Sequence, residues 1–251
     1  MARTFARATV DRVTLSIGAL NFVPPVSLAV LARKTTDSQN EVIFRAGSGA
    51  GASWFLNLRG SDNKMEFSNQ TTQIQATTLT LTVADGWSLV GVSKATGTAT
   101  PRFHKYVISS NTWTHDNAAG TIADPTTPGT NAFIGSSGAS SGFDGDIAVA
   151  GVWNVVLSDA QVETLPFSLA AWRQIDPKGL WLLDQQATGQ KVRDLTGNGA
   201  NESSLTGTSV ATTSVPLFSY GAPMPRVQIQ PAAVGGGGAN SPRDLLLLGA
   251  G

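Results

Sequence analysis

Residues 143–162 read FDGDIAVAGVWNVVLSDAQV, and this stretch decides the fold of the chain. Asp144-Gly145 is a turn dipeptide, because glycine adopts positive φ without steric cost. The side chains that follow alternate with a period of two, and neither face carries a charge beyond Asp146, which predicts a strand in the middle of a sheet. Ser158-Asp159-Ala160-Gln161 has the spacing of a capping box and predicts a short helix directly after the strand.

The remainder of the chain predicts more strands and little helix. Short alternating or β-branched segments are separated by turns rich in Gly, Ser, Asn and Pro. These segments are residues 3–22, 26–33, 41–45, 54–59, 64–68, 70–84, 85–93, 102–108, 111–115 and 132–135. We expect residues 102–115 to form a hairpin that turns at Ser109-Ser110-Asn111. The pattern predicts an all-β, two-sheet antiparallel sandwich, with one or two helical turns near 158–173.

Residues 143–162 resemble the last core strand and helical turn of laminin-G-like, concanavalin A-like jelly rolls. In those domains the pattern is Phe-x-Gly-x-Ile-x-x-Val-x-Val-Trp/Tyr-Asn-x-x-Leu-Ser-x-x-x-Val/Ile. Residues 179–184 and 194–201 are similar to the family's opening strand and its Asp-x-Ser-Gly-Asn-Gly-Asn loop, which usually come first. The resemblance implies a circularly permuted jelly roll over residues 1–222, closed by strand 179–184 and residues 192–210. It also implies that Trp87 packs between the sheets.

A similar order of segments, with a Pro-x-Phe ending like Pro216-Leu217-Phe218, occurs in virion proteins of tailed bacteriophages. The resemblance therefore implies a non-enzymatic structural protein of the virion, either a capsid decoration or a minor tail protein. Its expected partners are capsid or tail subunits and further copies of itself, and its expected location is the virion.

The composition restricts the classes of partner. Lys+Arg and Asp+Glu both number 17, charged residues make up 14% of the chain, and there is no cysteine. A chain with no net charge lacks the basic surface that binds nucleic acid. The absence of cysteine excludes disulfides and thiolate metal sites. The sequence shows no signal peptide and no apolar run that could span a bilayer. We therefore expect synthesis in a host cytoplasm.

The chain changes character after residue 222. Residues 223–251 are a Pro- and Gly-rich linker that ends in Leu245, Leu246, Leu247 and Leu248. One interpretation is a frayed tail or an additional edge strand of the same sandwich. The interpretation that we favour is a hook that docks on a neighbouring subunit, because an exposed run of four leucines is a sticky patch.

No catalytic motif stands out. The sequence lacks a Gly-x-Ser-x-Gly elbow and the paired carboxylates of a glycoside hydrolase, so we expect no enzymatic activity and no cofactor. His104 and His115 show no local ligand spacing, and we interpret both as polar strand or loop residues. Asp144 and Asp146 are weak candidates for calcium, since this ion prefers oxygen ligands.

A carbohydrate-binding function is the alternative to a virion role. Trp54, Tyr106 and Trp113 are the aromatic residues that the core pattern explains least. His115 and Asn111 flank Trp113, and aromatic faces with neighbouring polar groups suit sugar rings. These three residues, Trp113, His115 and Asn111, are the predicted site of a lectin-like module for glycans on a host surface.

Overall fold

The computed structural model describes residues 2–9, 11–18, 22–47, 54–69, 71–125, 129–136, 141–183, 192–207 and 209–210. The chain divides into residues 1–218 and 219–251, and all described residues belong to the first part. The predicted linker and the leucines 245–248 lie outside the described residues. None of the described helices is long and apolar enough to cross a membrane.

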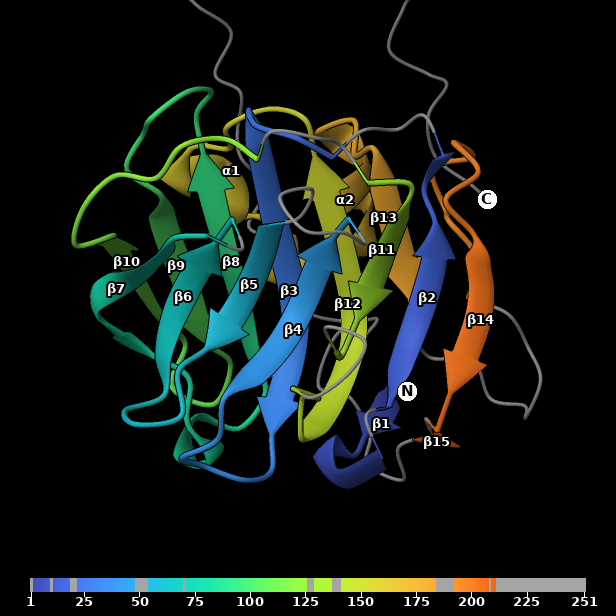
Figure 1. Ribbon diagram of the computed structural model, residues 1–251, viewed down its shortest axis with the longest axis horizontal. Coiled ribbons are helices and arrows are strands. Elements are labelled where there is room, and N and C mark those ends of the chain that lie inside the picture. Colours follow the sequence, from blue (N-terminus) through green and yellow to red (C-terminus); the bar gives the residue numbers. More distant parts are fainter. Residues whose placement is uncertain are drawn as a thin grey trace, which may run out of the picture. The chain divides into compact units, whose positions relative to one another are not determined.

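Two antiparallel sheets pack face to face (Figure 1). Sheet A has the order β10 (Thr112–Asn117), β9 (Arg102–Val107), β8 (Ser88–Lys94), β3 (Val26–Lys34), β12 (Gly145–Trp153), β1 (Arg3–Phe5) and β15 (Ser209–Val210), and β13 (Gly179–Leu182) also pairs with β12. Sheet B has the order β14 (Glu202–Thr206), β2 (Arg12–Ser16), β11 (Asn131–Ile134), β4 (Glu41–Ala46), β5 (Trp54–Leu58), β6 (Lys64–Ser68) and β7 (Gln73–Thr80). The prediction of an all-β two-sheet sandwich is confirmed.

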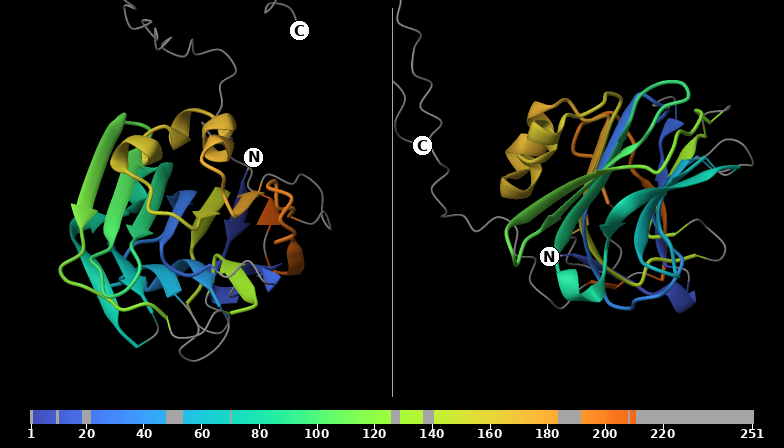
Figure 2. Two further views of the ribbon diagram at one scale, coloured as in Figure 1. Left: turned by 90° about the horizontal axis from the view of Figure 1, so that it is seen from above. Right: turned by 90° about the vertical axis from the view of Figure 1, so that its left-hand side faces the viewer.

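Sheet A carries apolar side chains on both faces. Its inner face and the inner face of sheet B form the main core, which contains Phe44, Val90 and Trp181. Its outer face carries a second apolar layer that includes Trp153 and Trp172. The short helices α1 (Asp159–Val162), η4 (Leu165–Phe167) and α2 (Leu169–Gln174) cover this layer (Figure 2). The predicted helical turns near 158–173 are thus present, and they bring polar residues of α1 against sheet A.

Strand β12 is buried over all 9 of its residues, as predicted for a strand in the middle of a sheet. Its alternation is broken by an irregularity between Ile147 and Val149, so that Ile147 faces the main core and Val149 faces the outer layer. The predicted turn at Asp144-Gly145 is wrong, because Gly145 is already paired with Lys34. A side chain at Gly145 would collide with the carbonyl oxygen of Arg33, so close approach of the backbones explains this glycine.

The expectation that Trp87 packs between the sheets is also wrong. Trp87 belongs to the outer apolar layer with Leu89, and the Arg33 guanidinium carbon lies 5.6 Å from its ring centroid. The reason is the register of β8, in which Val90 faces the main core and Leu89 points the other way.

Strands from the C-terminal part of the described chain lie next to strands from its N-terminal part in both sheets. β1 and β13 pair with successive parts of β12, and β14 pairs with β2 at the edge of sheet B. The Trp181 side chain enters the main core, where its Nε1 donates a hydrogen bond of 2.7 Å to the carbonyl oxygen of Ala200.

Candidate functional site

The hairpin of β9 and β10 places the two histidines of the chain side by side. The antiparallel register pairs His104 with His115 and Tyr106 with Trp113. The two histidine Nδ1 atoms lie 2.9 Å apart, and the ring planes meet at 75°. Interpreting the histidines as isolated polar residues missed this pair. The sequence contains the information needed to predict the pair, because a turn at residues 109–111 sets the register of the whole hairpin.

Helix α1 and its C-cap residue, Glu163, add two carboxylates to the histidine pair. Asp159 Oδ1 lies 3.6 Å from Nδ1 of His104 and 3.6 Å from Nδ1 of His115. Glu163 Oε1 lies 3.0 Å from His115 Nε2. The predicted capping box starts the helix, with both reciprocal bonds between Ser158 and Gln161 present. Asp159 and Glu163 are four positions apart, so one helical turn presents both to the hairpin.

Burial and ion pairing set the charges of this cluster. His104 is 1% exposed, and burial, followed by the neighbouring His115, lowers its pKa to about 4. Its ring is therefore neutral at pH 7. Arg102 donates from Nε to Asp159 Oδ1 at 2.7 Å, and this hydrogen bond lowers the pKa of Asp159. The carboxylate of Asp159 is thus ionised and fixed in position.

A buried row of hydroxyl groups lies behind His104. The His104 Nε2 atom is 3.1 Å from Ser93 Oγ, which is 2.9 Å from Ser27 Oγ. Ser93, His104 and Asp159 have the residue types of a hydrolytic triad. Ser93, however, is 3% exposed, and its hydroxyl contacts Ser27. The hydroxyl of Ser93 is therefore buried and hydrogen-bonded within sheet A, and it is not presented at the surface as a nucleophile.

An aromatic surface adjoins the histidine pair, and we call Tyr106, Trp113, His115 and Phe167 the Trp113 surface. Trp113 stacks on His115, with ring centroids 5.4 Å apart and planes at 10°, and lies 4.9 Å from Tyr106. Phe167 contacts Tyr106 edge to face at 5.9 Å and is 60% exposed. Asn111 Oδ1 accepts a 2.7 Å hydrogen bond from the Tyr106 hydroxyl. The three predicted sugar-site residues therefore lie in one cluster with Tyr106, an aromatic candidate from the sequence, and with Phe167, which the structure adds.

The other predicted candidates have different surroundings. The carboxylate of Asp146 forms an ion pair with Arg33 and accepts a 2.6 Å hydrogen bond from the Thr4 hydroxyl, and Asp144 Oδ2 accepts one from Thr36 at 2.6 Å. Oxygen atoms that already bind cationic or hydroxyl groups are less available to calcium.

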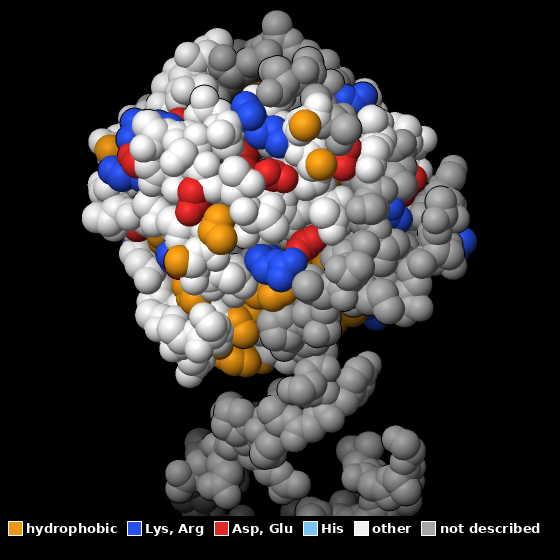
Figure 3. All heavy atoms as spheres, turned by 90° about the horizontal axis from the view of Figure 1, so that it is seen from below, with side chains coloured by type: hydrophobic (Ala, Val, Ile, Leu, Met, Phe, Trp, Pro, Cys, Tyr) orange, Lys and Arg blue, Asp and Glu red, His pale blue; other side chains and the backbone are white. Residues whose placement is uncertain are grey.

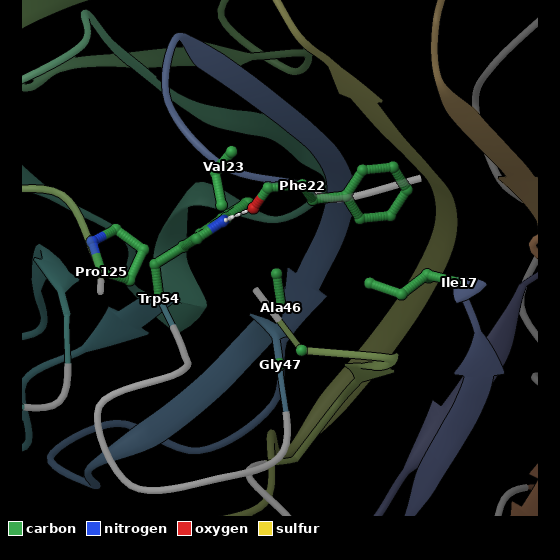
Figure 4. Close-up of a pocket in the computed structure, with 8 residues that line it drawn as sticks. Ile17, Phe22, Val23, Ala46, Gly47, Trp54 and Pro125 are labelled. Atoms are coloured by element: carbon green, nitrogen blue, oxygen red, sulfur yellow. Dashed lines mark hydrogen bonds between the residues drawn. The ribbon is translucent and has the colours of Figure 1, made fainter. Parts of the chain in front are cut away.

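Trp54 is part of the main core, and its Nε1 donates to the carbonyl oxygen of Phe22. It lines a small pocket with Ile17, Ala46 and Pro125 (Figure 4). Trp54 is thus explained by packing in the main core, whereas Trp113 is only partly buried and packs against the outer apolar layer.

Comparisons with known proteins support the fold. No family model matches the chain, and no curated protein matches it by sequence. The enzymatically active domain of tailspike protein 2 from bacteriophage CBA120 is similar in structure, with a TM-score of 0.51, 13% identity, and coverage of 73% of this chain and 30% of that chain. The heptameric SAP-like pentraxin of Limulus polyphemus has a TM-score of 0.44 at 14% identity, covering 65% of this chain and 80% of that one. Domains LG4-5 of the mouse laminin α1 chain have a TM-score of 0.44 at 10% identity, covering 78% and 47%. The fold is a concanavalin A-like jelly-roll sandwich. The chain spans less than a third of the length of the tailspike protein.

Proposed function

We propose that this chain is a non-catalytic binding module that holds a saccharide against the Trp113 surface. The observation that carries the proposal is the fixed orientation of Trp113, which is stacked on His115 and supported by Tyr106, beside the exposed ring of Phe167. The apolar C–H faces of sugars pack on aromatic rings, and a platform whose rotamers are already fixed loses little entropy on binding. Asn111 supplies polar groups at the same place.

A glycan array probed with the full-length protein tests this proposal. We expect one related group of saccharides to bind, and we expect W113A and F167A to weaken that binding by about tenfold or more, because hot-spot aromatics dominate small interfaces. V83A is the matched control, since Val83 is 40% exposed, lies in η3 (Val83–Asp85), and is not one of the four residues of this surface. An array without hits, or equal binding by W113A, would overturn the proposal.

We further propose that the module is a structural component of a tailed-phage virion, either a capsid decoration or a minor tail protein. Two observations favour this role. The tailspike protein contains a similar sandwich as one part of a longer chain. The visible surface carries charges of both signs dispersed among uncharged groups (Figure 3), which suits packing against other subunits or copies of the same chain.

Purified phage particles that encode this chain test the virion proposal. We expect mass spectrometry to detect the protein in particles, and we expect deletion of residues 235–251 to reduce its incorporation, because the leucines 245–248 are the proposed docking hook. Absence from washed particles would overturn the virion role. Unchanged incorporation of the deletion variant would overturn the hook alone.

A further inference from the structure

We propose that His104, His115 and Asp159 bind one divalent transition-metal ion, with Zn²⁺ as the best match. The ion would connect the β9–β10 hairpin to α1. Neither the saccharide nor the virion proposal requires this site. Three features of the cluster support the site: the distances among the ligand atoms, the contacts around the two rings, and the groups that orient the ligands.

The ligand atoms have the correct separation for a single ion. His104 Nδ1, His115 Nδ1 and Asp159 Oδ1 form a triangle with sides of 2.9, 3.6 and 3.6 Å. The point equidistant from the corners of such a triangle is about 2.0 Å from each of them, and Zn–N and Zn–O bonds measure about 2.0–2.2 Å. An ion near this point keeps a further position open for water. Two imidazoles and one carboxylate are donors that suit zinc, and the two Nδ1 atoms come from paired residues of one hairpin.

Contacts at both Nε2 atoms leave the two Nδ1 atoms facing each other. The Glu163 carboxylate accepts from His115 Nε2, so Nε2 of that ring carries the proton. Ser27 Oγ lies 2.8 Å from the carbonyl oxygen of Val155 and donates to Ser93 Oγ at 2.9 Å, and Ser93 Oγ lies 3.1 Å from His104 Nε2. The two Nδ1 atoms lie 2.9 Å apart, which leaves room for no more than one proton between them. An ion that binds both lone pairs takes the place of that proton.

Neighbouring groups hold each ligand in place, as they do at metal sites in general. Glu163 and Ser93 fix the two imidazoles through Nε2. Arg102 holds Asp159 through one lone pair of Oδ1, and that oxygen has a second lone pair for the ion. The His104 side chain is 1% exposed and that of Asp159 is 35% exposed, so an ion reaches the site from the α1 side.

Zinc titration of the full-length, tag-free protein, first treated with a chelator, tests the proposal. The chain has 2 His and no Cys, so the imidazole signals in long-range ¹H–¹⁵N NMR spectra come only from these two rings. We expect one Zn²⁺ per chain, shifts of both Nδ1 resonances, and protonated Nε2 atoms in the zinc-bound state. Co²⁺ should give the visible absorption of a low-coordinate N/O site, and Zn²⁺ should displace it.

Variants distinguish this site from adventitious binding. We expect H115Q and D159N to weaken Zn²⁺ affinity by about a hundredfold or more. Glu163 only positions His115, so we expect E163Q to weaken the affinity by about 10–100-fold. D176N is the control, because Asp176 is 86% exposed on its side chain and pairs with Lys178. Thermal melts in chelator verify that each variant folds. Absence of stoichiometric Zn²⁺ binding, or unchanged affinity in folded H115Q and D159N, would overturn the proposal. In that case the two Nδ1 atoms would share a proton and would bind no ion.

Discussion

At the scale of single residues, Glu41 is a carboxyl group that folding places away from water. It is 1% exposed at the start of β4, and Lys34 Nζ lies 3.5 Å from its Oε2. Burial raises the pKa of Glu41 to about 7, and the attraction of Lys34 opposes this rise only in part. The charged groups that face this position are Lys34, Asp37 near Lys34, and Asp144. At neutral pH the carboxyl group of Glu41 is therefore close to the midpoint of its titration.

Glu41 makes stability fall as the pH rises. Its pKa is higher in the folded protein than its ordinary value of 4.5, so the folded state holds the proton more tightly. The stabilising contribution is complete below pH 4.5 and is lost as the pH passes 7. The shift corresponds to about 3 kcal/mol. We expect urea unfolding to show this loss in the wild-type protein between pH 4.5 and 8, and to show its absence in E41Q.

The E41Q variant is a clean comparison because Lys34 retains other partners. Its Nζ donates to Asn63 Oδ1 at 2.7 Å and lies 3.8 Å from Asp37. The difference between the two pH profiles therefore isolates the titration of residue 41. Parallel profiles for the two proteins would contradict the assigned direction of the pKa shift.

At the scale of elements, α1 determines whether the carboxylates reach the histidine pair. The helix has 4 residues, and a helix this short depends on its cap. Ser158 Oγ accepts from the Gln161 backbone N–H at 3.3 Å, and Gln161 Oε1 accepts from the Ser158 backbone N–H at 2.9 Å. Asp159 and Glu163 are held at the hairpin only while this turn is formed.

Removing the cap should weaken both the helix and the site. We expect S158A to lower the free energy of unfolding by about 1 kcal/mol, whereas S158G should cost only a few tenths, because glycine is tolerated at this position. Chemical denaturation measures both values. Amide hydrogen exchange should be faster in residues 159–163 of S158A. Equal stability of S158A and the wild-type protein would show that packing on sheet A, and not the cap, holds α1.

Patterns within single elements could be predicted, whereas contacts between elements mostly could not. The strand after Gly145 and the capping box were visible because each depends on side chains a few positions apart. The irregularity at Ile147 and Val149 was not visible, since it results from pairing with β3. Of the candidate site, Trp113, His115 and Asn111 were identified by their proximity in the chain. Glu163 and Phe167 were missed because helix packing, about fifty positions later in the chain, brings them there.

At the scale of the whole molecule, the sandwich is completed by strands from both ends of the described chain. β1 and β13 share one side of β12, and β14 extends sheet B beside β2. A domain whose first and last strands are neighbours in both sheets tolerates a change in the order of its segments. This arrangement is what the inferred circular permutation requires, and it makes the contacts of β13 essential to the core.

Trp181 is the residue on which this closure depends most. Its side chain is fully buried, packs edge to face on Phe22 at 6.1 Å and at a tilt on Phe44 at 6.2 Å, and binds the carbonyl oxygen of Ala200. We expect W181A to lower the free energy of unfolding by about 3–5 kcal/mol, because truncation leaves a large cavity and an unpaired buried carbonyl group. F167A, which removes an exposed ring, should cost less than about 1 kcal/mol. Urea unfolding, monitored by circular dichroism, measures the free energy of unfolding of both variants. A small decrease in W181A would mean that the sandwich is stable without the contacts of β13.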